Sequence, residues 1–94
     1  MKLGFEWDEE KAKSNLKKHR VDFDEAETVF TDPFSITIHD SDHSTDEQRL
    51  VDIGSSDKGH ILVVVYTERG ATLRIISCRK ATPSERTVYE EGNG

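Results

Sequence analysis

The sequence contains little cysteine and no long apolar run. Cys78 is its single cysteine, so an intramolecular disulfide is impossible. This cysteine lies in an apolar, strand-like pattern with no histidine near it in the sequence, which favours a buried, reduced thiol over a nucleophile. No stretch approaches the about 18 apolar residues of a membrane helix, and residues 1–8 lack the apolar core of a signal peptide. We therefore expect a soluble, cytoplasmic protein without a membrane partner.

Positive charge is also scarce. The 13 Lys/Arg against 19 Asp/Glu give a net charge of −6, which by itself argues against nucleic acid as a partner. The charges are distributed unevenly: residues 21–48 carry nine acidic residues and no Lys/Arg, whereas residues 49–94 carry seven Lys/Arg and six acidic residues. A folded face can still be cationic, because fields from exposed charges are screened beyond about 8–10 Å at physiological salt.

The first third of the chain carries two sets of helix start signals. Asp8 is a suitable N-cap for a helix at 9–19, with acidic residues in its first turn and lysines in its last. Asp22 begins a second helix, and Glu25 follows it at the spacing of a capping box. Pro33 predicts the end of this helix, because the residue before proline avoids the helical conformation.

Alternating apolar and polar residues predict strands in the rest of the chain. A short strand is expected at 5–7, and longer strands are expected at 34–39, 49–54, 61–66 and 73–79. The connections between the last three strands are too short for crossover helices, which predicts an antiparallel meander. The expected fold is therefore α+β, with two N-terminal helices packed on a four-stranded, mainly antiparallel sheet and a C-terminal helix.

Five cationic residues lie on or just beyond the predicted strands: Arg49, Arg69, Arg74, Arg79 and Lys80. Guanidinium groups bind phosphate bidentately and keep their charge through a reaction, so one interpretation is a phosphate site. The alternative is that these cations pair with the abundant carboxylates on solvated strand edges. Because successive side chains of a strand alternate, Arg74 and Arg79 are expected on opposite faces unless a bulge intervenes.

If the phosphate bound by such a site belonged to RNA, cleavage without a metal would need two further groups. One activates the ribose 2′-hydroxyl, and the other is an acid for the leaving oxygen. The residues of suitable type are Glu47, His60, Lys80, Glu85 and Tyr89. For Glu85 a structural role is the alternative, because Thr82, Pro83 and Glu85 match the N-cap, N1 and N3 positions of a capping box.

A second candidate site is a polar segment with metal-ligand residue types, formed by His39, Asp40, Asp42 and His43. The alternative is a solvated acidic loop, because no further ligand lies at a convincing spacing elsewhere. We expect no metal and no cofactor.

The sequence resembles the BrnT family of toxins along nearly its whole length. The segments that carry the resemblance are residues 5–19 (FEWDEEKAKSNLKKH), 21–26 (VDFDEA), 47–54 (EQRLVDIG), 63–69 (VVVYTER) and 74–81 (RIISCRKA), followed by Glu85-Arg86 and Tyr89. No single motif is decisive, but five in register are specific.

The resemblance implies a single BrnT-like toxin domain at 1–94 with a RelE-like fold. It further implies a type II toxin that cuts RNA, is neutralised by a BrnA-type antitoxin in a heterotetramer, and meets DNA only through that antitoxin. The family's functional positions carry over to Glu47, Arg49, Arg69, Arg79, Lys80, Glu85 and Arg86. Because the chain is acidic where a free ribonuclease toxin is expected to be neutral or basic, the alternative is a non-catalytic antitoxin-binding module or an inactive family member.

Overall fold

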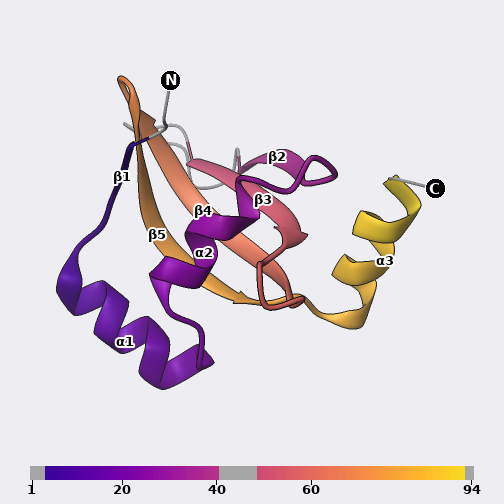
Figure 1. The fold of residues 1–94 in the computed structure, drawn as a ribbon, viewed down its shortest axis with the longest axis horizontal. Coiled ribbons are helices and arrows are strands. Elements are labelled where there is room, and N and C mark those ends of the chain that lie inside the picture. Colours follow the sequence, from indigo (N-terminus) through magenta and orange to yellow (C-terminus); the bar gives the residue numbers. More distant parts are fainter. Residues whose placement is uncertain (1–3, 41–48, 93–94) are drawn as a thin grey trace.

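The chain folds into one mixed β-sheet with helices packed against it (Figure 1). The structure is a computed structural model, and it describes residues 4–40 and 49–92. Its elements are β1 (Gly4–Glu6), α1 (Glu9–His19), α2 (Phe23–Val29), β2 (Ile36–Asp40), β3 (Arg49–Ser55), β4 (Ile61–Arg69), β5 (Thr72–Lys80) and α3 (Pro83–Gly92). The predicted α+β class is confirmed. No helix in these two ranges is long and apolar enough to cross a membrane.

The sheet has five strands in the order β1-β5-β4-β3-β2, so the expectation of four strands was wrong. The antiparallel part is as predicted, because β2 pairs antiparallel with β3, β3 with β4, and β4 with β5. The fifth strand is β1, which pairs parallel with β5 and places Phe5 opposite Leu73. The sequence indicated a strand at 5–7 but held no sign of its partner, which lies more than 60 residues away in the chain.

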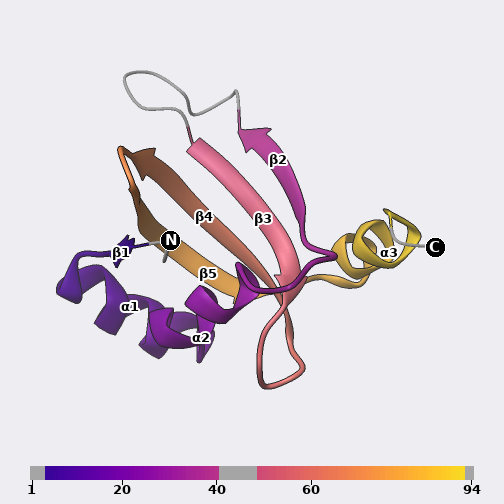
Figure 2. The same ribbon diagram turned by 45° about the horizontal axis from the view of Figure 1, so that its top comes forward.

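Helices α1 and α2 lie together on one face of the sheet, and α3 lies at the other end of the molecule beside β2 and β3 (Figure 2). The core between the two N-terminal helices and the sheet is formed mainly by Val21, Phe23, Ala26, Val29, Leu50, Leu62, Val64, Tyr66, Leu73, Ile75 and Cys78. We call the sheet side that contributes to this core the helix face. The opposite side carries no N-terminal helix. It presents the strand residues that alternate along the chain with those of the helix face.

The predicted first helix begins and ends where its signals lie. The Asp8 side chain accepts hydrogen bonds from the backbone N–H groups of Glu10 and Lys11, and Arg20 closes the helix in a left-handed conformation with φ of 61°. Asn15 then attaches α1 to the sheet. Its side-chain amide donates to the backbone oxygens of Val21 (2.9 Å) and Cys78 (2.8 Å) and accepts from the Cys78 N–H (3.1 Å).

Candidate functional site

A β-bulge in β5 decides which arginines share a face. Val65 lies opposite Ser77, but the next residue of β4, Tyr66, lies opposite Ile75, so Ile76 is the extra residue. The bulge shifts the alternation of β5 by one position. Arg74, opposite Thr67, and Arg79, opposite Val63, consequently point to the same side of the sheet. The expectation that strand alternation separates Arg74 from Arg79 was therefore wrong, and the reason is this one inserted residue.

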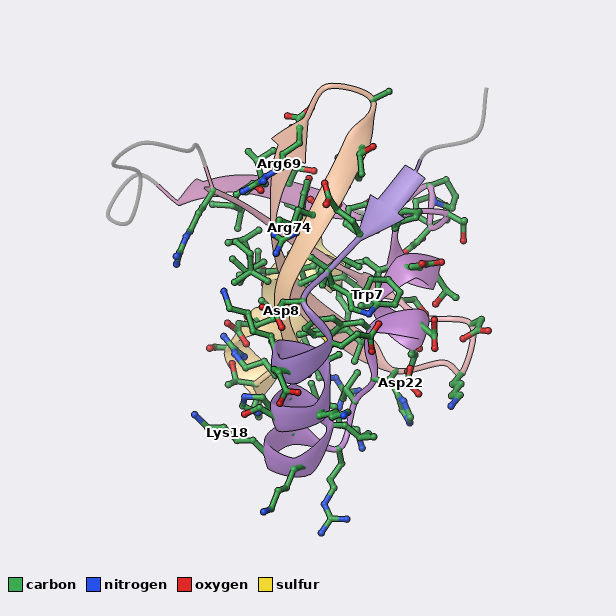
Figure 3. The ribbon with its side chains drawn as sticks, turned by 90° about the vertical axis from the view of Figure 1, so that its left-hand side faces the viewer. Trp7, Asp8, Lys18, Asp22, Arg69 and Arg74 are labelled. Atoms are coloured by element: carbon green, nitrogen blue, oxygen red, sulfur yellow. The ribbon has the colours of Figure 1, made fainter. Side chains whose placement is uncertain are left out.

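The side of the sheet opposite the helix face thus carries Arg49, Arg69, Arg74 and Arg79, and we call it the arginine face. Arg49, Thr67 and Arg74 form one cross-strand row over β3, β4 and β5. Arg69 lies two residues beyond Thr67 on the same side of β4, and Figure 3 shows it near Arg74 on the β4–β5 hairpin. Thr67 is 3% exposed, and within the described ranges its hydroxyl finds no hydrogen-bond partner.

Two arginines of this face are held by carboxylates. Arg79 forms a bidentate pair with Glu85, with Nη1 to Oε1 at 2.7 Å and Nη2 to Oε2 at 2.8 Å. Arg74 contacts Glu6 of β1 at 3.2 Å. The hydrogen bonds with Glu85 raise the pKa of Arg79, so this guanidinium stays charged and is a poor proton donor. The alternative interpretation, pairing with carboxylates, is thus realised for these two residues.

Glu85 forms the predicted capping box as well as the pair with Arg79. Its Oε1 accepts from the Thr82 N–H (2.9 Å), while its own N–H donates to Thr82 Oγ1 (3.3 Å). The hydrogen bonds from Arg79, together with those from Thr82, lower the pKa of Glu85 to about 2. A carboxylate with this pKa is a weak base at neutral pH, so the geometry suits Glu85 to positioning Arg79 rather than to accepting a proton.

Tyr89 is tied to an aspartate that sequence reasoning did not select as a site residue. Its hydroxyl donates to Asp32 Oδ2 (2.7 Å), and this bond raises the pKa of Tyr89 to about 12. Burial raises the pKa of Asp32, but hydrogen bonds from the Ser55 N–H, Tyr89 and the Phe34 N–H outweigh it and lower the pKa. Asp32 therefore fastens α3 to the start of the β2 segment, and the sequence showed it only as a helix-ending Asp-Pro pair.

Lys80 lies on the other side of the sheet from Arg79. It pairs with Leu62, a core residue of the helix face. Lys80 also lines an open pocket of about 190 Å³ at the end of β5, which we call the basic pocket. Its walls are Gly59, His60, Ile61, Lys80, Ala81 and Arg86. The predicted site residues are therefore divided between two places: Arg49, Arg69 and Arg79 on the arginine face, with Glu85 beside Arg79, and Lys80 in the basic pocket. Glu47 lies outside the described residues.

The other chemical candidates contribute less. Of the possible metal ligands, His39 and Asp40 belong to β2, while Asp42 and His43 lie outside the described residues. Residues 4–40 and 49–92 contain no group of three or more His, Cys, Asp or Glu arranged to hold a metal ion. Cys78 is 1% exposed, and burial raises the pKa of its thiol to about 12, which disfavours a nucleophilic role.

Comparisons with known proteins agree on one family. The family profile described as the ribonuclease toxin BrnT of type II toxin–antitoxin systems matches residues 7–85. The fold is similar to the crystal structure of the Brucella abortus ribonuclease toxin BrnT, with a TM-score of 0.66 and 26% sequence identity over 86% of this chain and 99% of that chain. A search of curated proteins gave no match. The profile covers most of the chain, and the chain therefore belongs to the BrnT family of ribonuclease toxins of type II toxin–antitoxin systems.

Proposed function

We propose that this protein is a metal-independent endoribonuclease toxin that binds an RNA phosphodiester on the arginine face. The observation that carries the proposal is the β5 bulge, which brings Arg74 and Arg79 to the side of the sheet that also carries Arg49 and Arg69. This side carries no N-terminal helix, and its four arginines are half-buried or exposed, so an extended strand of RNA can reach their guanidinium groups. A concentration of guanidinium groups in an acidic chain is the arrangement that a phosphate ligand requires.

In the proposed reaction the arginines stabilise charge and a carboxylate handles the proton. The ribose 2′-hydroxyl loses its proton to Glu47, and the 2′-oxygen attacks the adjacent phosphorus. The phosphorus–O5′ bond breaks, and the 5′-oxygen takes a proton from water. Arg49, Arg69 and Arg79 stabilise the negative charge on the pentavalent phosphate. Glu47 is proposed as the base because Glu85 is held by Arg79 with a pKa of about 2.

RNA cleavage by the purified protein tests metal independence and the role of the arginines. Purified protein should cut single-stranded RNA in EDTA, and Arg49→Ala and Arg79→Ala should each lower the rate by at least about 10²-fold, as the loss of one charge-stabilising donor does elsewhere. Lys13→Ala, on the exposed side of α1, is the matched control and should cut at the wild-type rate. The proposal fails if the wild type leaves RNA intact in EDTA and Arg79→Ala arrests growth as strongly as the wild type.

The finer family features are part of the same proposal. We infer a cytoplasmic toxin that a BrnA-type antitoxin neutralises in a heterotetramer, because the family is one of type II toxin–antitoxin systems. Co-expression with the adjacent antitoxin gene should relieve growth arrest. The co-purified complex should show two copies of each chain by light scattering.

One observation favours a second candidate, a binding module without catalytic activity. Arg74 and Arg79 are each neutralised by a carboxylate, so part of the positive charge of the arginine face is already compensated. Expression without antitoxin discriminates between the two candidates. Growth arrest supports the toxin, and normal growth with intact antitoxin binding supports the module.

A further inference from the structure

The basic pocket is built where the β3–β4 turn meets the end of β5 and the helix α3 that follows it. His60 ends the β3–β4 turn, Lys80 ends β5, and Arg86 lies in the first half of α3. The turn is held by hydrogen bonds between the Ser56 N–H and the His60 oxygen (2.8 Å) and between the Gly59 N–H and the Ser56 oxygen (3.0 Å). The three cationic or titratable side chains thus line one cavity where the β3–β4 turn, the end of β5 and α3 meet.

A buried carboxylate fixes the histidine. His60 Nδ1 lies 2.9 Å from Glu25 Oε2, and the Ser56 hydroxyl donates to the same oxygen at 2.6 Å. Burial raises the pKa of Glu25, but the hydrogen bonds from Ser56 and His60 outweigh it and lower the pKa. The ionised Glu25 therefore orients the imidazole through Nδ1. Nε2 faces away from Glu25, and it donates to an anion only when the imidazole is protonated on both nitrogens.

The other two cations of the pocket contrast with those of the arginine face. Arg79 and Arg74 are paired with Glu85 and Glu6. Within residues 4–40 and 49–92, by comparison, no carboxylate forms an ion pair with the Lys80 ammonium or the Arg86 guanidinium. Two unpaired cations around one cavity, in a chain of net charge −6, form a concentrated positive charge that favours an anionic ligand.

We propose that the basic pocket binds a backbone phosphate of a single-stranded RNA, next to the phosphate that is cleaved. Arg86 supplies the bidentate contact and Lys80 a point charge, and the imidazolium form of His60 adds a hydrogen bond from Nε2. Arg79 and Lys80 are consecutive and lie on opposite sides of the sheet at the end of β5, so a strand leaving the arginine face around this end reaches the pocket. The RNA identity of the ligand rests on the proposed function; the phosphate site itself rests on the pocket alone.

Binding of a non-cleavable RNA tests the role of the pocket. The probe is a fluorescent 2′-O-methylated oligoribonucleotide, and anisotropy is measured over a range of salt concentrations. Because the pocket holds one phosphate of a single strand, losing this contact should lower the magnitude of the slope of log K against log salt by about 0.7. We expect this change, with at least about tenfold weaker binding, in Lys80→Gln/Arg86→Gln. The control Lys11→Gln/Lys18→Gln removes the same charge from exposed positions of α1 and should retain the wild-type slope.

A second measurement examines the phosphate site without RNA. Titration of the wild type with inorganic phosphate should shift the backbone amide signals of Gly59, His60 and Ala81 in ¹⁵N-correlated NMR spectra, and Lys80→Gln/Arg86→Gln should abolish the shifts. Equal thermal midpoints of the double variant and the wild type establish that the variant is folded.

The outcomes separate the pocket from the proposed function. Suppose that the wild type cuts RNA, while the double variant has the same salt slope as the control variant and still shows the phosphate-induced amide shifts. The pocket proposal is then overturned and the ribonuclease stands. If RNA stays intact while phosphate shifts these amides and oligonucleotide binding depends on Lys80 and Arg86, the phosphate site stands and the ribonuclease is overturned.

Discussion

Replacing Glu85 by glutamine tests whether this residue positions Arg79 or takes part in proton transfer. Glutamine keeps the size of the side chain and its hydrogen bond from the Thr82 N–H, so the substitution removes mainly the negative charge that faces Arg79. One pH unit of pKa lowering corresponds to about 1.4 kcal/mol. The lowering of the Glu85 pKa from 4.5 to about 2 therefore sets an upper limit of roughly 3.4 kcal/mol on the stabilisation.

The expected loss is smaller because solvent screens the pair. The Arg79 side chain is 40% exposed and that of Glu85 is 27% exposed, so we expect Glu85→Gln to lower the free energy of unfolding by about 1–2 kcal/mol at pH 7. The pKa of Glu85 is lowered in the folded state. Its stabilisation is therefore complete above about pH 4.5 and is lost as the pH falls toward 2. The difference between wild type and variant should shrink in the same interval.

Urea denaturation followed by the fluorescence of Trp7, the single tryptophan, measures this difference at pH 7, 5 and 3. Trp7 is a suitable reporter because its ring packs edge-on against the buried Phe23 at 5.8 Å. Glu90→Gln, an exposed position of the same helix, is the matched control and should be neutral or slightly stabilising. A stability difference for Glu85→Gln that stays constant from pH 7 to pH 3 would refute the reasoning.

The same variant separates the two functional roles. If Glu85 positions Arg79, Glu85→Gln should reduce the rate of RNA cleavage by less than about tenfold and leave the acidic limb of the pH–rate profile in place. Loss of a general base typically costs about 10²–10⁴-fold. A reduction of that size, with loss of the acidic limb, would assign proton transfer to Glu85.

Two further substitutions and one thiol-modification experiment test the fold around the site. Asn15→Ala leaves two main-chain oxygens and the Cys78 N–H without their side-chain partner, and should lower the free energy of unfolding by about 2–4 kcal/mol in the urea assay. Gly54→Ala should destabilise by about 1–3 kcal/mol in the same assay, because a Cβ there would lie 2.9 Å from Val29 Cγ1 and from Ser35 Cβ. The Cys78 thiol should stay unmodified by a thiol reagent at pH 8 and react only when urea unfolds the chain.

The helices were predictable because their signals are local. Asp8 and Thr82 cap helices through hydrogen bonds to residues two or three positions away, and these bonds form as the sequence predicted. The Asp22–Glu25 capping box formed only in part. The Asp22 side chain accepts from the Glu25 N–H, but the Glu25 carboxylate instead bonds Ser56 and His60. A tertiary contact thus redirected a side chain that its local spacing assigned to the helix start.

The candidate site depended on information that short segments do not contain. A one-residue change of register moves every following side chain of a strand to the other face, and the extra residue Ile76 has no mark in the sequence. That residue brings Arg74 to the side of Arg79, while Lys80 lies on the opposite side. The parallel pairing of β1 with β5, which brings Glu6 to Arg74, likewise joins residues that are 68 positions apart in the chain.

By itself, the sequence determined the elements, the chemistry available to them and the family resemblance, because caps, alternation and residue types are properties of short segments. The tertiary structure decided which of those residues act together, because strand register, the bulge and the convergence of turn, strand end and helix depend on long-range pairing. It placed the arginines on one face and separated Lys80 from them. It also assembled a pocket from His60, Lys80 and Arg86, which are up to 26 residues apart in the sequence.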